Sequence, residues 1–187
     1  KDRIMNITVN TDKCVGCNAC IRTCPVSEAN SAIQCEDGTS YVDINNEKCL
    51  HCGECIKACE HGARDYTDDS EALLSALERS EQVYVVVAPA IKNMTDWTGI
   101  LGYLQSKGAL LNDVSLGADL CTWAHLRYVQ NNPNAKIISQ PCPAIVNYAL
   151  KYKNELIPFL SPLQSPMGCS CVYLKKYEKY HGKIAIL

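Results

Sequence analysis

The chain has 187 residues, of which 18 are basic and 20 are acidic, so its formal net charge is -2. This length is enough to bury a sizeable core in one large domain or two small ones. No polybasic segment suggests nucleic acid or an anionic membrane as a partner, and no apolar run approaches the roughly 18 residues that cross a bilayer. The first residues carry no signal-peptide pattern.

Two runs of four cysteines share one spacing, in which two, two and three residues separate successive cysteines. Chains with this spacing hold two [4Fe-4S] clusters, and the fourth cysteine of each run ligates the cluster of the other run. Zinc sites favour separated pairs of cysteines, so zinc is the weaker interpretation. We therefore expect one cluster on Cys14, Cys17, Cys20 and Cys59, and a second on Cys49, Cys52, Cys55 and Cys24.

Three further side chains near the runs are not expected to bind the clusters. Cys35 does not fit the spacing, so we expect a free thiol there. His51 and His61 flank a run whose cysteines already fill the ligand positions. Thiolate ligands persist most readily in a reducing compartment, so we expect a cytoplasmic protein.

The segments that contain the runs read as one small domain over residues 1–67. Ile4–Val9 and Tyr41–Ile44 alternate as strands do, and each leads into a ligand loop. Gly16 and Gly53 lie between ligands, where a loop folding around a cluster needs unusual backbone angles. Short strands with loops and helices of this kind predict an α+β fold.

The second half has the alternating pattern of an α/β domain. A helical linker over residues 68–81 leads to Gln82–Pro89, a continuous apolar run typical of a strand buried on both faces of a parallel sheet. Alternating helices and strands then predict a mostly parallel sheet over residues 82–187. We expect helices at about 95–107, 119–131, 143–152 and 167–180, and strands near 113–116, 136–139 and 183–187.

The later cysteines form a weaker candidate site. Cys142 lies between two prolines at the expected carboxyl end of a strand and just before a helix, whose dipole favours a thiolate. A third metal site is plausible there. Cys169 and Cys171 follow near another helix start and could surround the same site, although core packing explains them equally well, and Cys121 reads as an ordinary buried cysteine.

Four ordered motifs of the second half carry a resemblance to a known family. They are Ala88-Pro89-Ala90, Gly117-Ala118-Asp119-Leu120, Ser139-Gln140-Pro141-Cys142-Pro143, and Glu155-Leu156-Ile157-Pro158-Phe159-Leu160-Ser161 with Ser165-Pro166. In this order they resemble the catalytic domain of iron-only ([FeFe]) hydrogenases over roughly residues 82–187. Residues 1–67 resemble the 2[4Fe-4S] ferredoxin module that commonly precedes that domain, which implies a ferredoxin-like fold. The resemblance implies that the clusters feed an H-cluster, with Cys142 as a tentative ligand.

Two departures from this family limit the expected activity. The family usually has a proton-relay cysteine directly before the ligand, whereas this chain has Pro141, which cannot carry a proton. Such variants resemble the sensory or regulatory branch, in which hydrogen is detected rather than turned over rapidly. The family's later ligand motifs do not occur before Leu187. We therefore expect a piece of a longer protein, without catalysis of its own; the alternative is a different cluster on Cys142, Cys169, Cys171 and Cys121.

The expected function is electron transfer through two [4Fe-4S] clusters to or from a hydrogenase-like domain. The partner is expected to be a redox protein, or a hydrogenase or sensor domain in the same chain. Two alternatives remain: a non-catalytic hydrogenase-like protein of regulation or cluster assembly, and a simple ferredoxin with a vestigial tail.

Overall fold

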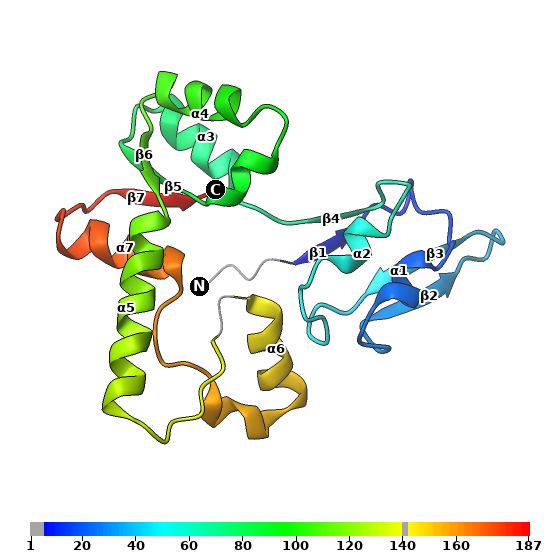
Figure 1. Ribbon diagram of the computed structural model, residues 1–187. Coiled ribbons are helices and arrows are strands. Elements are labelled where there is room, and N and C mark those ends of the chain that lie inside the picture. The colour runs from blue at the N-terminus through cyan, green and yellow to red at the C-terminus, as the bar shows by residue number, and fades with distance from the viewer. Residues whose placement is uncertain (1–5, 140–141) are drawn as a thin grey trace. The chain divides into compact units, whose positions relative to one another are not determined.

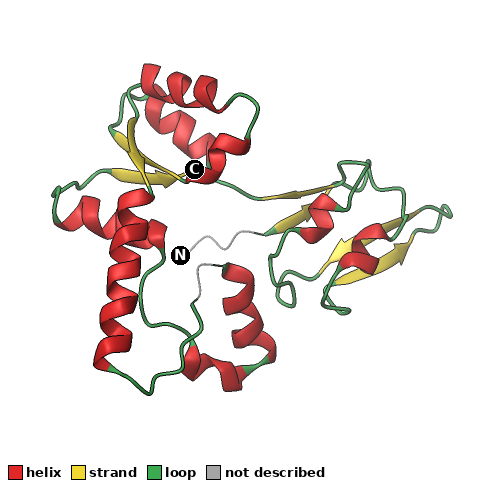
Figure 2. Cartoon of the chain, viewed as in Figure 1, coloured by secondary structure: helices red, strands yellow, loops and turns green. Residues whose placement is uncertain are grey.

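The computed structural model describes residues 6–139 and 142–187, which fall into two compact units (Figures 1 and 2). The first unit combines the chain up to Asp68 with Cys142–Leu160, and the second combines Asp69–Pro141 with Ser161–Leu187. The sequence predicts a linker at residues 68–81 between the two domains. In the structure, the segment Cys142–Leu160 belongs to the unit that contains the cysteine runs.

Among its described residues, the first unit contains two short antiparallel strand pairs, three α-helices and one 3-10 helix. Strand β1 (Ile7–Val9) pairs with β4 (Arg64–Tyr66), and β2 (Asn30–Gln34) pairs with β3 (Ser40–Ile44). Helices α1 (Ala19–Thr23) and α2 (Glu54–Lys57) each lie inside one cysteine run and pack against each other. Helix α6 (Pro143–Tyr152) continues into the 3-10 helix η2 (Asn154–Phe159).

Cysteines form part of the core of this unit. Three of them, one from the first run and two from the second, are buried together with aliphatic side chains of the strands; this core comprises Ile7, Cys20, Ala29, Val42, Cys49 and Cys55. Helices of four and five residues are too short to be stable alone. Their formation therefore depends on this shared core and on whatever the cysteines bind.

The second unit is built on a three-stranded parallel sheet. Its order is β6 (Leu110–Asp113), β5 (Val83–Val87) and β7 (Lys183–Ile186), with β5 in the centre. The connections contain α3 (Ser70–Glu78), η1 (Pro89–Asn93), α4 (Trp97–Ser106), α5 (Ser115–Asn131) and α7 (Pro166–Lys176). The expected mostly parallel sheet is thus present, with β5 and β7 at the predicted positions.

Both faces of β5 are covered, as its continuous apolar sequence predicted. Val83, Val85 and Val87 belong to a core shared with side chains of α3, η1 and α4. Val86 belongs to a second core with Val114 and with Leu174 of α7. This layering is visible in Figure 1, where α3 and α4 lie on one side of the sheet and α7 on the other.

Four expected elements differ from the structure. The helix expected at about 119–131 is α5 at Ser115–Asn131, which begins four residues earlier. The strand expected near 113–116 is β6 at Leu110–Asp113, because Asp113 accepts hydrogen bonds from Ser115 and α5 already begins there. Residues 136–139 do not form a strand; Ile138 makes only an isolated bridge, and its carbonyl oxygen accepts a hydrogen bond from the Ser161 amide at 2.9 Å. Helix α7 ends at Lys176 rather than near residue 180.

Some expectations concern residues outside the described ranges. These are the first part of the strand Ile4–Val9 and the relay position Pro141. Within the part of the chain that the structure describes, no helix is long and apolar enough to cross a membrane.

Candidate iron-sulfur centre

The two cysteine runs fold into loops with the same backbone conformation. Gly16 and His51 occupy the same position in their runs and have φ angles of 66° and 58°. Asn18 and Gly53 are equivalent in the same way, with φ angles of 60° and 81°. Left-handed backbone is uncommon outside glycine, so its recurrence at both positions extends the repeat from sequence to conformation.

A pocket in the first unit is lined by cysteines from both runs. Cys24 of the first run and Cys49, Cys52 and Cys55 of the second line it. These four are the cysteines expected to hold one cluster together. The pocket therefore brings the fourth cysteine of one run to the first three of the other.

Backbone amides point at two of the cysteine sulfurs. The His51 amide donates to Cys49 Sγ and the Ala63 amide to Cys59 Sγ, both at 3.3 Å. Although burial opposes it, hydrogen bonds from the amides of Ala63, His61 and Arg64 lower the pKa of Cys59. Amide hydrogen bonds of this kind stabilise a thiolate and help to set cluster potentials.

The buried thiols of the second run are harder to ionise. Burial raises the pKa of Cys49, and it raises the pKa of Cys55 to about 11. Burial also lowers the pKa of His51, with a further contribution from the Lys151 ammonium. At neutral pH the thiols of Cys49 and Cys55 would be protonated in the metal-free chain, so metal binding must displace their protons.

Arg64 places a buried positive charge among the cysteines. Its side chain is 5% exposed, and Nη2 donates to Cys20 Sγ at 3.4 Å and to the Val42 carbonyl at 3.0 Å. Its Nη1 is buried and finds no hydrogen-bond partner among the described residues. A buried charge is costly unless it is paired, and an anionic iron-sulfur cluster at Cys20 would supply the missing counter-charge.

The donor set fits iron-sulfur clusters on these grounds. All eight cysteines of the runs are free thiols, and thiolates are the ligands of such clusters.

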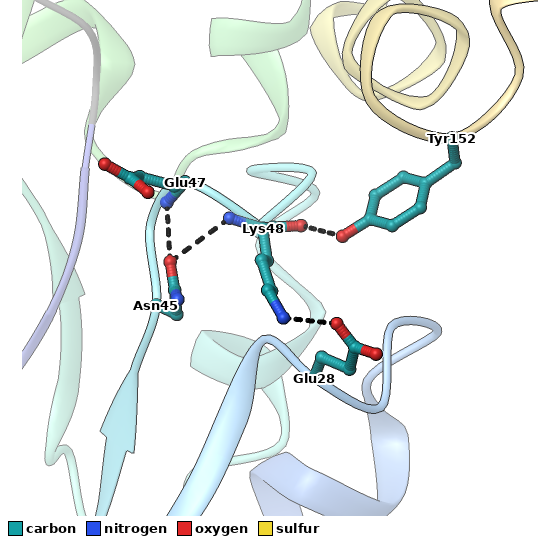
Figure 3. Close-up of polar contacts among 5 residues, drawn as sticks. All are labelled: Glu28, Asn45, Glu47, Lys48 and Tyr152. Atoms are coloured by element: carbon teal, nitrogen blue, oxygen red, sulfur yellow. Dashed lines mark hydrogen bonds and ion pairs between the residues drawn. The ribbon is translucent and has the colours of Figure 1, made fainter.

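Helix α6 holds the start of the second run from outside. The Tyr152 hydroxyl donates to the Lys48 carbonyl at 2.7 Å, and the Lys48 ammonium forms an ion pair with Glu28 (Figure 3). The Asn45 side chain accepts from the Glu47 and Lys48 amides at 3.0 and 3.3 Å. These contacts between α6 and the second run could not be predicted from the sequence, because no local pattern connects residues about a hundred positions apart.

Cys142 is the N-cap residue of α6 and is exposed. The expected helix therefore follows it, but the expected strand does not precede it. Cys142 belongs to the first unit, whereas Cys169 and Cys171 lie on α7 in the second. Their grouping around one site remains a prediction.

In the second unit, Cys169 lies near Cys121. Both thiols donate to the Gln164 carbonyl oxygen, at 3.8 and 3.3 Å. Burial raises the pKa of Cys169, with a smaller contribution from Cys121, and burial also raises the pKa of Cys171. Cys121 Sγ is 3.5 Å from Nδ1 of His125. Cys121 and Cys169 are partly buried thiols that link α5 and α7 to the loop at Gln164.

Comparison with known families defines the class of each half. Residues 13–63 match the 4Fe-4S dicluster domain, so the loops described above are part of an iron-sulfur domain. Residues 81–186, more than half of the chain, match the C-terminal domain of the iron-only hydrogenase large subunit. The chain belongs to the iron-only hydrogenase large subunit family and carries an N-terminal 4Fe-4S domain, as the motifs predicted. No curated protein matches the chain.

Proposed function

We propose that the chain binds two [4Fe-4S] clusters and passes single electrons between them and its hydrogenase-family domain. The observation that carries the proposal is the pocket in which Cys24 of the first run meets three cysteines of the second. The interleaved pattern assigns the first cluster to Cys14, Cys17, Cys20 and Cys59, and the second to Cys24, Cys49, Cys52 and Cys55. On this assignment the first unit has an α+β ferredoxin-like fold.

The protein's own residues would bind the clusters and stabilise their charge. Each bound cluster would accept or release one electron, which is the chemistry that the cofactor supplies. The amides of His51 and Ala63 donate to ligand sulfurs, and Arg64 offsets negative charge in the buried region. Such thiolate ligation suits a reducing compartment, and we propose the cytoplasm.

The hydrogenase-family domain is proposed to serve detection or regulation rather than rapid hydrogen turnover. Support comes from the sequence: Pro141 stands where the family's relay cysteine precedes the ligand, and a proline side chain has no proton to transfer. The electron partner would then be a redox protein or a further sensor domain. Cys142 keeps the thiol expected of a cluster ligand and is exposed at the start of α6.

The test is to load the full chain anaerobically with iron and sulfide. About eight irons per chain and the EPR signals of two reduced cubes are expected. About four irons, or zinc alone after purification, would contradict the two-cluster assignment. With reduced methyl viologen as the electron donor, the loaded chain should form hydrogen from two protons and two electrons no faster than the background rate. A rate of hydrogen formation that rises with the viologen concentration would contradict the regulatory role.

A further inference from the structure

Within the part of the chain that the structure describes, Arg64 is a buried cation without an acidic partner. It begins β4, pairs with Val9 of β1, and is 5% exposed. The ion pairs found among the described residues involve other side chains. Since arginine keeps its charge at all ordinary pH values, the folded chain carries a permanent positive charge in this region.

One terminal nitrogen of the Arg64 guanidinium makes hydrogen bonds, and the other makes none with the described residues. Nη2 donates to the Val42 carbonyl at 3.0 Å, which orients the group, and to Cys20 Sγ at 3.4 Å. Nη1 is buried and has no partner within residues 6–139 and 142–187. Buried polar groups are normally satisfied, so an unpartnered nitrogen on a guanidinium that contacts a cysteine sulfur indicates a place for an anion.

Cysteines of both runs lie close to Arg64. Its side chain donates to Cys20 Sγ, and the amide of the preceding residue, Ala63, donates to Cys59 Sγ at 3.3 Å. Cys59 and Cys20 come from different runs but are assigned to the same cluster. Arg64 and its chain neighbour therefore contact two of the ligands assigned to the first cluster.

We propose that Arg64 supplies the buried counter-charge of the cluster at Cys20 and raises the reduction potential of that cluster above that of its neighbour. This inference rests on the proposed function. One electron from a low-potential reductant adds one negative charge to the cluster, with no bond made or broken. A fixed positive charge in a poorly screened region favours the reduced form and so raises the midpoint potential.

The test is an EPR-monitored redox titration of the loaded full chain with dithionite and mediators. Arg64→Met should lower the equilibrium constant for reducing the cluster at Cys20 about tenfold. For a one-electron couple this corresponds to a midpoint potential lower by about 59 mV, and the potential of the other cluster should shift less. Arg64→Gln keeps a donor but not the charge and should behave like Arg64→Met. Arg64→Lys keeps the charge and should stay closer to the wild type. Arg22→Met is the matched control, because Arg22 is exposed and, among the described residues, its side chain donates only to the Cys17 carbonyl.

Each outcome separates the role of Arg64 from the proposed function. A wild-type chain without [4Fe-4S] signals overturns the proposed function. Loaded Met and Gln variants with wild-type potentials, or an Arg64→Lys variant that cannot be loaded, overturn the role of the charge. Loading by Arg64→Lys but not by the neutral variants supports it. As a second measurement, the metal-free Arg64→Met chain should unfold at the same or a higher temperature than the metal-free wild type, and clear destabilisation would indicate a merely structural role.

Discussion

The Lys151 ammonium nitrogen lies 2.7 Å from the carbonyl oxygen of Cys49. It is one of three donors that α6 directs at consecutive carbonyls, since Tyr152 reaches Lys48 at 2.7 Å and Asn147 reaches Leu50 at 3.1 Å. The helix that follows Cys142 therefore holds the backbone at the first cysteine of the second run. Part of the hydrogenase-family region thus stabilises the iron-sulfur loop directly.

Asn147→Ala tests this support. Its side-chain amide is part-buried, and the substitution leaves the Leu50 carbonyl without that donor, a loss of about 1 kcal/mol. In the loaded chain we expect faster removal of iron by a chelator, confined to one of the two clusters. The rate is followed by the loss of cluster absorbance, and the remaining cluster is counted by EPR.

Asn132→Ala is the control for Asn147→Ala. Asn132 lies in the second unit and donates to the Tyr128 carbonyl at 2.9 Å, so it makes a similar side-chain to backbone bond away from the cysteine runs. Its variant should release iron at the wild-type rate. Equal acceleration in both variants would show that general loss of stability, rather than support of the loop, controls iron release.

A second prediction concerns the packing of α5 against α7. A Cβ atom at Gly117 would lie 2.2 Å from the Pro166 carbonyl oxygen, so Gly117→Ala must displace backbone. We expect it to lower the free energy of unfolding by about 1–3 kcal/mol, as overpacking does. Gly102→Ala on α4 meets no atom within 4 Å and should instead stabilise by up to about 1 kcal/mol, because alanine favours helix. Thermal unfolding followed by circular dichroism compares the two, and two stabilising results would contradict the close contact.

Gly117 also shows why one boundary could not be predicted from sequence. The sequence pattern predicted a helix at about 119–131, yet α5 begins at Ser115 and includes Gly117. The residue is glycine because of the distant Pro166 and Ser170, not because of local chain geometry. The continuous apolar sequence of β5, by contrast, was enough to predict a strand buried on both faces, since that pattern reflects its whole environment.

The same contrast holds at the candidate site. Cysteine spacing predicted which thiols share a loop, because ligand geometry is encoded locally. Arg64 and Lys151 were missed, since each acts on a cysteine far away in sequence: Cys20 for Arg64 and Cys49 for Lys151. The expected strand at 136–139 was wrong because an apolar run becomes a strand only where a neighbouring strand pairs with it, and Ile138 has one isolated bridge.

A third prediction follows from an ion-pair network at the edge of the second unit. Glu81 accepts from Lys183 Nζ at 2.6 Å and from Arg79 Nε at 2.8 Å, and these two partners lower its pKa. Because the pKa of Glu81 is lower in the folded chain, its carboxylate stabilises the fold at pH values above its unfolded pKa of about 4.3. This contribution is lost as the pH falls through the pKa of the folded chain.

Glu81→Gln should therefore lower the thermal midpoint slightly at pH 7 and have no effect at strongly acidic pH. Metal-free chains avoid the acid lability of clusters, and the Trp97 side chain, which packs against the core of the second unit, provides a fluorescence signal. High salt should reduce the difference at pH 7, because the carboxylate is partly exposed and therefore screened. A difference that is the same at both pH values would have another origin.

The last prediction tests which cysteines share a cluster. Cys24→Ala should remove the second cluster and Cys59→Ala the first, each lowering the iron content from about eight to about four per chain. Cys35→Ala is the control and should keep about eight, since Cys35 lies in the turn after β2, where its amide donates to the Thr39 carbonyl at 2.8 Å. Iron analysis and EPR spin counts are the measurements.

Double variants make the assignment unambiguous. Cys24→Ala combined with Cys49→Ala damages one proposed cluster twice, so it should lose no more iron than Cys24→Ala alone. Cys24→Ala combined with Cys14→Ala damages both clusters and should lose nearly all iron. If ligation followed the runs instead, Cys24 and Cys14 would belong together and the two results would be exchanged. The pocket that Cys24 shares with Cys49, Cys52 and Cys55 favours the interleaved outcome.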